Sequence, residues 1–268
     1  MNNSENINLV KYCIQNMCSK NTAFKILDEK GISYNRASSY NDIANYFNSE
    51  SIISIEELTS LFRSIWEPAP IEFHLKNLRS GSLKGHSWHQ AMPSMLHHSL
   101  QNKVRDCING SISIDDLIEM GADIMRHEYF MVSTHDLCET TIINHFPTCI
   151  PPIRSKSISD FVFNGMPYDL KCTNPILYES KEKLVSNKLE VIKKLCTGAD
   201  ITRIRAQAQK TINNWGLNRF YIIVMNQEKW LQQPEAILKQ LIVECQKLQD
   251  PISVRFEEIQ IQTHLVVI

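Results

Sequence analysis

The segment SISDFVFNGMPYDLKCTN, residues 157–174, contains two short apolar runs joined by Asn164-Gly165. Asn-Gly between two apolar runs is the strongest local signal for a β-hairpin with a two-residue type I′ turn. Counting outward from that turn places Asp160 directly opposite Asp169, as a non-hydrogen-bonded pair whose Cβ atoms lie about 4.5–5.5 Å apart. Two like charges in such a pair destabilise a hairpin, so this segment needs a specific explanation.

A bound metal ion would explain the two aspartates. Lys171 lies two residues beyond Asp169, hence on the same face of the strand, and it can neutralise one carboxylate but not both. Magnesium is bound by one or two carboxylates and completes its coordination shell with water and phosphate oxygens. We therefore expect Asp160 and Asp169 to bind Mg²⁺, with Lys171 placed to orient a water and to offset charge on a phosphate. The alternative is a solvated cluster of surface ion pairs, which contributes little to stability.

The motif formed by Asp160 and, nine residues later, Asp169-Leu170-Lys171 resembles that of the PD-(D/E)XK nuclease superfamily, which includes most type II restriction endonucleases. The order of elements over about 134–226 is similar too: a helix, the hairpin with the motif, a helix and a buried strand. The resemblance implies Mg²⁺-dependent cleavage of double-stranded DNA by a sequence-specific homodimer. It also implies that Asp160, Asp169 and Leu170 bind the metal, and that Lys171 assists the attacking water.

The motif departs from the common pattern in two places. Ser159 stands where the family often has proline, and Asp169 replaces the more frequent glutamate. Two other functions therefore stay open. One is a repair or recombination nuclease on the same fold, and the other is a non-catalytic DNA-binding regulator in which the hairpin is structural.

A third carboxylate precedes the hairpin. Residues 134–146 are predicted to be helical, and Glu139 shares a face with Ile142, Ile143 and Phe146. A carboxylate on an apolar face is costly unless it is paired or bound to a metal. Many members of the similar family carry a glutamate on this helix, which makes Glu139 a candidate third metal ligand. The alternative is an edge position whose carboxylate reaches solvent.

A different metal site is conceivable in the same region. His135-x-x-Cys138 and His145-x-x-x-Cys149 supply residue types that bind zinc. The spacing between the two pairs is short, and the first pair lies on the helix that carries Glu139. We therefore favour the carboxylate site, because such spacings discriminate loosely.

Candidate DNA contacts lie on a predicted helix over 199–215 and in a basic stretch over 73–105 that contains no carboxylate. Long basic and amide side chains suit phosphate and base-edge contacts. The candidates are Arg203, Gln207 and Lys210 on the helix, and Arg79 and Lys84 in the basic stretch. Family members often carry a glutamine on the equivalent helix, which Gln207 or Gln209 could match. The alternative is an ordinary solvated polar face.

Composition limits the class of protein. The chain has 268 residues, of which 43% are hydrophobic and 21% charged, and its net charge is −1. Acidic residues outnumber basic ones in residues 1–150, and the reverse holds in 151–268, which favours a local positive surface for a polyanion. The chain has neither an apolar run of the roughly 18 residues that a membrane span needs nor a secretory signal, and its eight cysteines are scattered. We expect a cytoplasmic protein with reduced thiols and no membrane contact.

Periodicity divides the chain near residue 126. Residues 1–125 read as a mainly helical region, including a capping box at Ser54, for DNA clamping or dimerisation. Residues 126–268 read as helix, hairpin, helix, strand over 218–226, helix after Pro234, and a closing strand over 252–261. This order predicts an α/β domain with a restriction-endonuclease-like mixed sheet flanked by helices.

Overall fold

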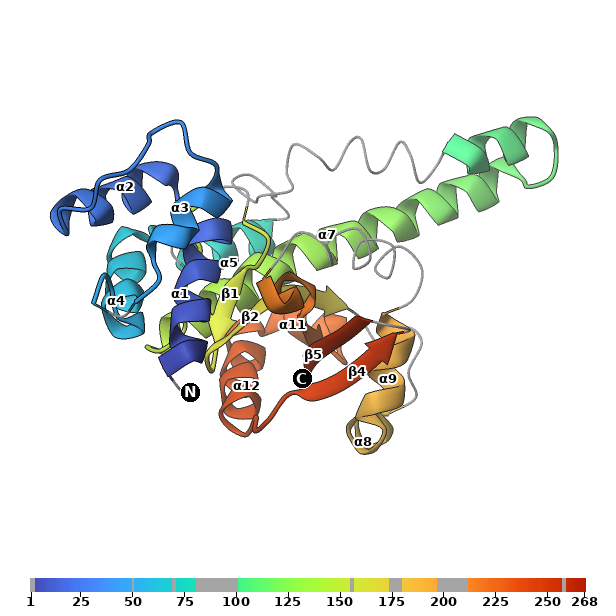
Figure 1. Cartoon of the computed structure of the whole chain (residues 1–268). Helices are drawn as coiled ribbons and strands as arrows, with labels where there is room; N and C mark the ends of the chain where they lie inside the picture. Colours follow the sequence, from blue (N-terminus) through green and yellow to red (C-terminus); the bar gives the residue numbers. More distant parts are fainter. Residues whose placement is uncertain are drawn as a thin grey trace.

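The N-terminal part of the molecule is helical, as predicted (Figure 1). In the computed structural model the described residues are 3–49, 51–68, 71–80, 101–154, 157–173, 180–196, 212–256 and 259–268. The first helices are α1 (Asn3–Asn16), α2 (Lys20–Glu29), α3 (Tyr40–Tyr46), α4 (Ile55–Ile65) and α5 (Ile71–Ser80). The capping box predicted at Ser54 is present, because Ser54 Oγ accepts from the Glu57 N–H and the Glu57 side chain accepts from the Ser54 N–H.

One long helix, α7 (Ile114–His145), connects this part to the sheet. The predicted helix over 134–146 is only the last part of α7, which begins at Ile114 and continues for 32 residues. No proline interrupts this range, and the single Gly121 is tolerated inside a helix. The boundary predicted at residue 126 therefore falls within a continuous helix.

The sheet is mixed and has five strands in the order β1-β2-β3-β5-β4. They are β1 (Phe161–Phe163), β2 (Met166–Thr173), β3 (Arg219–Ile223), β4 (Ile252–Phe256) and β5 (Ile259–Val267). β2, β3 and β5 are parallel, whereas β1 and β4 pair antiparallel at the two edges. The closing strand predicted over 252–261 is instead a pair of strands, and the second of them, β5, lies inside the sheet.

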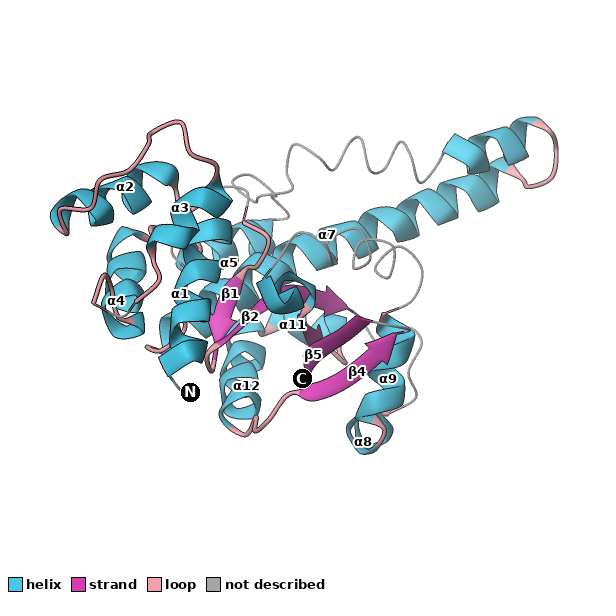
Figure 2. Ribbon diagram, viewed as in Figure 1, coloured by secondary structure: helices cyan, strands magenta, loops and turns pink. Residues whose placement is uncertain are grey.

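Helices cover both faces of the sheet (Figure 2). On one face, α7 and α12 (Pro234–Gln246) pack on alternate strand residues such as Leu170 and Phe220. On the other face, α8 (Lys181–Ser186) and α9 (Lys188–Leu195) pack on Tyr221 and Leu265. The remaining described elements are a 3-10 helix, η1 (Ile212–Leu217), and α11 (Gln227–Gln232). The α/β class and the flanking helices were predicted correctly.

The N-terminal helices share a core with the hairpin. A third cluster joins residues of α1 to α4, such as Tyr12 and Phe62, to Ile150 and Val162. Across the described part of the chain, no helix is long and apolar enough to cross a membrane. All eight cysteines are free thiols.

Candidate metal centre

The hairpin has the predicted turn. Asn164 has φ 49° and Gly165 has φ 78°, so both central residues occupy the left-handed region that a type I′ turn requires. Phe161 pairs with Tyr168 and Phe163 with Met166, which is the predicted register.

The prediction for Asp160 is wrong in one respect. The ladder ends at Phe161, and the Asp160 N–H donates to the Tyr168 carbonyl at 2.9 Å. The chain therefore bends before the next pair can form, and Asp160 does not lie opposite Asp169 as a ladder partner. Instead the Asp160 carboxylate turns back and accepts from the Leu170 N–H at 2.6 Å. A backbone hydrogen bond thus fixes Asp160 beside β2.

Asp169 is buried between two cations. Lys171 Nζ lies 2.6 Å from Asp169 Oδ1, which confirms that these two side chains share a face of β2. Arg219 on β3 is directly in register with Asp169, and its Nη1 lies 3.4 Å from Asp169 Oδ2. Arg219 is completely buried and also donates to the carbonyls of η1 residues Gly216 and Leu217. Sequence reasoning missed Arg219, although an arginine at the start of the apolar run over 219–224 was the available signal.

Helix α7 brings a second group of side chains to the hairpin. His135 Nε2 lies 3.6 Å from Asp160 Oδ2, while its Nδ1 lies 3.3 Å from Asp136 Oδ1 and 3.7 Å from Glu139 Oε2. Ligand atoms of His135, Asp136 and Glu139 all lie within 4.8 Å of one another, close enough to share one metal ion. Sequence reasoning did not identify Asp136, and it considered His135 only as a zinc ligand.

Burial and mutual repulsion shift the ionisation of this group. Burial raises the pKa of Glu139 to about 8, and the charge of Asp160 adds to the effect. Burial alone would lower the pKa of His135, but contacts with Asp136, Asp160 and Glu139 raise it well above its usual value. The pKa of Asp160 is lowered, because the contacts with His135 and Lys171 and the Leu170 N–H outweigh burial. The proton on Glu139 and the positive charges of His135 and Lys171 therefore reduce the repulsion between the carboxylates.

The residue types fit a divalent cation. Asp136, Glu139 and Asp160 each lie within ion-pair distance of His135, and Asp169 interacts with Asp160 through charge while contacting Lys171 and Arg219. Carboxylate oxygens are the ligands that Mg²⁺ prefers, and an imidazole additionally suits transition metals. The described geometry therefore supports a divalent metal, without distinguishing Mg²⁺ from other divalent ions.

Of the predicted DNA contacts, Arg79 is described by the structure, and it forms an ion pair with Glu235 on α12. Arg203, Gln207, Lys210 and Lys84 lie outside the described residues.

The predicted zinc set is not assembled. Cys138 is completely buried in the same core cluster as Cys172 and Cys245, and this burial raises the pKa of its thiol. His145 Nε2 instead faces the Gln246 amide at 3.3 Å. Within the part of the chain that the structure describes, the residues whose ligand atoms already lie close enough to share an ion are His135, Asp136 and Glu139. Asp160 and Asp169 do not belong to this set of three, although Asp160 contacts it through His135 at 3.6 Å.

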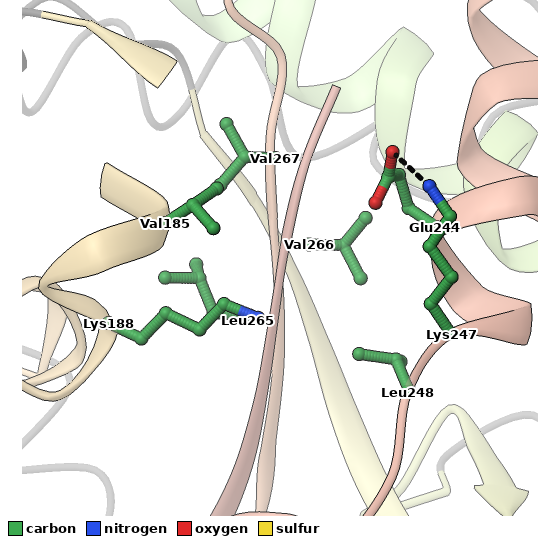
Figure 3. Close-up of a pocket in the computed structure, with 8 residues that line it drawn as sticks. All are labelled: Val185, Lys188, Glu244, Lys247, Leu248, Leu265, Val266 and Val267. Atoms are coloured by element: carbon green, nitrogen blue, oxygen red, sulfur yellow. Dashed lines mark hydrogen bonds and ion pairs between the residues drawn. The ribbon is translucent and has the colours of Figure 1, made fainter. Parts of the chain in front are cut away.

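A small cavity lies elsewhere, between α8, α9, α12 and β5 (Figure 3). Its volume is about 70 Å³, and Glu244 at its mouth forms an ion pair with Lys247 at 3.1 Å. Its lining consists of Val185, Lys188, Glu244, Lys247, Leu248, Leu265, Val266 and Val267. None of these is a predicted site residue, and the space holds little more than a few water molecules.

Comparison with known proteins gives no family assignment. No family model matches the chain, and neither a curated protein nor a solved structure matches it.

Proposed function

We propose that this protein is a Mg²⁺-dependent endonuclease that cleaves double-stranded DNA as a homodimer, in the manner of a type II restriction enzyme. The observation that carries the proposal is the meeting of three elements at one point. Glu139 on α7 lies 3.7 Å and Asp160 at the start of the hairpin lies 3.6 Å from His135. Asp169, which is paired with Lys171 on β2, lies near enough to Asp160 for the two charges to interact.

The residues have distinct roles in this proposal. Asp160 and Asp169 hold the ion, with Glu139 as a direct or water-mediated ligand. When bound, Mg²⁺ polarises the scissile phosphate and lowers the pKa of a coordinated water. Lys171 orients the attacking water and offsets the negative charge that develops on the phosphate. The 2.6 Å contact with Asp169 Oδ1 keeps the Lys171 ammonium in place for this role.

Two further features support the proposal. The Leu170 N–H holds the Asp160 carboxylate at 2.6 Å, so the motif's middle residue orients a ligand through its backbone. The strand after the hairpin, β3, runs parallel to β2, as expected for a hairpin, helix, strand order. Both features agree with the resemblance to the PD-(D/E)XK nuclease superfamily.

The test is a cleavage assay with purified protein, phage DNA and Mg²⁺. We expect discrete fragments from the wild type, and none from Asp169→Asn or Lys171→Ala, while salt-sensitive DNA binding remains. A loss of at least about 1,000-fold is expected, because removal of one group that stabilises the transition state costs on the order of 10²–10³-fold and metal affinity falls as well.

Matched controls are Asp250→Asn and Lys193→Ala, which alter the same residue types at exposed positions. Both controls should cleave like the wild type. Cleavage that survives Asp169→Asn and Lys171→Ala would refute the assignment. Salt-sensitive binding by a wild type that never cleaves would instead favour a DNA-binding regulator, and cleavage directed by DNA shape would favour a repair or recombination nuclease.

A further inference from the structure

A helical arm extends away from the body of the molecule (Figure 1, green). Its first limb is a helix over 101–108, and its second limb is the beginning of α7. The turn between them contains Gly110 at φ +75°, and Ser113 caps α7 by accepting from the Asp116 N–H. The tip is therefore a well-defined helical hairpin.

The arm exposes four large aliphatic side chains. Val104 and Ile108 on the first limb are 41% and 78% exposed, and Ile114 and Ile118 on α7 are 61% and 64% exposed. Residues four apart are neighbours on a helix surface, so each limb carries one apolar pair. These four account for much of the exposed large aliphatic surface in the described residues.

Both pairs lie on the same side of the arm. Each limb has a half-buried residue near the tip, Cys107 in the first and Leu117 in the second. Val104 and Ile108 stand three before and one after Cys107, and the pair in α7 has the same spacing around Leu117. In two antiparallel helices, equal offsets from the contact line project to the same side, so the four side chains form one apolar face.

The two edges of this face carry opposite charge. Arg105 precedes Cys107 by two residues, and Asp115 precedes Leu117 by two residues, so these side chains flank the face on its two limbs. Glu119 adds a second carboxylate on the α7 edge, and all three residues are exposed. The face is therefore basic along one limb and acidic along the other.

We infer that this face binds the same face of a second copy of this chain. In this dimer, a two-fold axis runs between the two arms and parallel to them. The 101–108 limb of one copy then packs against the α7 limb of the other. Arg105 of each copy then meets Asp115 and Glu119 of the other across the apolar centre, which gives a self-complementary contact. The carboxylates of α7 disfavour DNA as the occupant, because phosphates would repel them.

The test is the mass of the metal-free, DNA-free protein in sedimentation velocity over a range of concentrations. We expect a wild-type dimer, and a monomer for the double variant Ile108→Asp/Ile118→Asp. The matched control is Leu231→Asp/Val243→Asp, which changes aliphatic residues that are 45% and 46% exposed on α11 and α12. The control should remain a dimer. A monomeric wild type, or a dimer that survives the arm variant, would overturn the inference.

Charge exchange tests the arrangement of the two copies. Arg105→Glu should weaken the dimer at least tenfold in dissociation constant, and Arg105→Glu/Asp115→Arg should restore most of the affinity. If Arg105→Glu has no effect, or if the double exchange is weaker than the single variant, the two-fold arrangement is wrong. These measurements need neither Mg²⁺ nor DNA cleavage, so their outcome is independent of the proposed nuclease activity. An unchanged mass combined with lost DNA binding in the arm variant would assign the face to DNA and overturn its proposed role as the dimer contact.

Discussion

The two antiparallel strand pairs of the sheet differ in whether their polar and charged side chains face solvent or are buried. At the β4 edge, polar side chains such as Ser253 and Gln260 face solvent and bond to each other at 2.6 Å, while Val254 and Ile261 point inward. At the β1 edge, Asp169 lies inside the molecule with 4% of its surface exposed. The first pair follows the ordinary pattern of a half-buried sheet, whereas the second buries charge.

This difference has an energetic meaning. A buried carboxylate is costly unless cations and hydrogen bonds surround it, and replacing such a group by an apolar one often stabilises a protein. Leu170 and Cys172 fill the core face of β2, whereas Asp169 is buried on the opposite face against Lys171 and the completely buried Arg219. The β1 edge therefore contains a buried cluster of charges, whereas the β4 edge has the polar and apolar alternation of an ordinary half-exposed strand pair.

The largest effect on stability is expected from the substitution of Arg219, the buried partner of Asp169 at the β1 edge. Arg255 at the β4 edge provides the comparison. Arg219→Met removes the buried guanidinium beside Asp169 and leaves the carbonyls of η1 without their donor. It should lower the free energy of unfolding by about 3–5 kcal/mol. Arg255→Met, at an exposed position of β4, should change it by less than about 0.5 kcal/mol. Urea unfolding measures both.

A double variant sharpens this comparison. Asp169→Asn removes the charge that Arg219 compensates, so it should recover part of the stability lost in Arg219→Met. Equal losses in Arg219→Met and Arg255→Met would show that the two edges do not differ in the way described.

The sequence predicted the parts of the fold that depend on local chemistry. Asn164-Gly165 determined the turn and register, and the spacing of Asp169 and Lys171 determined their shared face. The bend at Asp160 could not be predicted, because it depends on a backbone hydrogen bond to Tyr168 and a side-chain contact with Leu170.

Contacts between distant segments were the main source of error. Arg219 reaches Asp169 only because β3 pairs in parallel with β2, and that pairing has no local signal. His135 reaches Asp160 only after α7 packs against the hairpin. The pair β4 and β5 was read as one strand, because neither Gly nor Pro marks the connection between them.

The pH dependence of stability is a second consequence of the charged edge. The folded pKa of Glu139, about 8, exceeds the usual value near 4.3 in an unfolded chain. Its contribution is therefore complete below about pH 4.3 and decreases as pH rises towards 8, and the raised pKa of His135 acts in the same direction. Without metal, the protein should lose about 2 kcal/mol of unfolding free energy between pH 6 and pH 8.

Glu139→Gln tests the origin of this dependence. The variant should show a much smaller loss between pH 6 and pH 8 in chelator-treated protein, since the group that loses its proton is gone. Glu56→Gln, at an exposed position of α4, should behave like the wild type. An unchanged slope in Glu139→Gln would assign the pH dependence to other residues.

The smallest expected effect concerns support for the β1 edge from the N-terminal helices. Tyr12 on α1 bonds to Ser159 at 2.6 Å, and both side chains are buried next to Asp160. Tyr12→Phe keeps the ring but removes this partner of a buried hydroxyl, so it should cost about 1 kcal/mol of unfolding free energy. Tyr34→Phe removes a solvent-exposed bond to Asp28 and should cost less than about 0.5 kcal/mol.

Ser159 lies directly before the bend at Asp160, so its bond to Tyr12 connects α1 to the segment that positions the Asp160 carboxylate. If α1 orients Asp160 through this bond, Tyr12→Phe should also weaken metal binding, measured by calorimetric titration with Mg²⁺, whereas Tyr34→Phe should not. A variant that loses stability but binds metal like the wild type would limit α1 to packing. An effect on metal affinity would make the helical N-terminal part and the β1 edge one functional unit, in contrast to the β4 edge at the other side of the sheet.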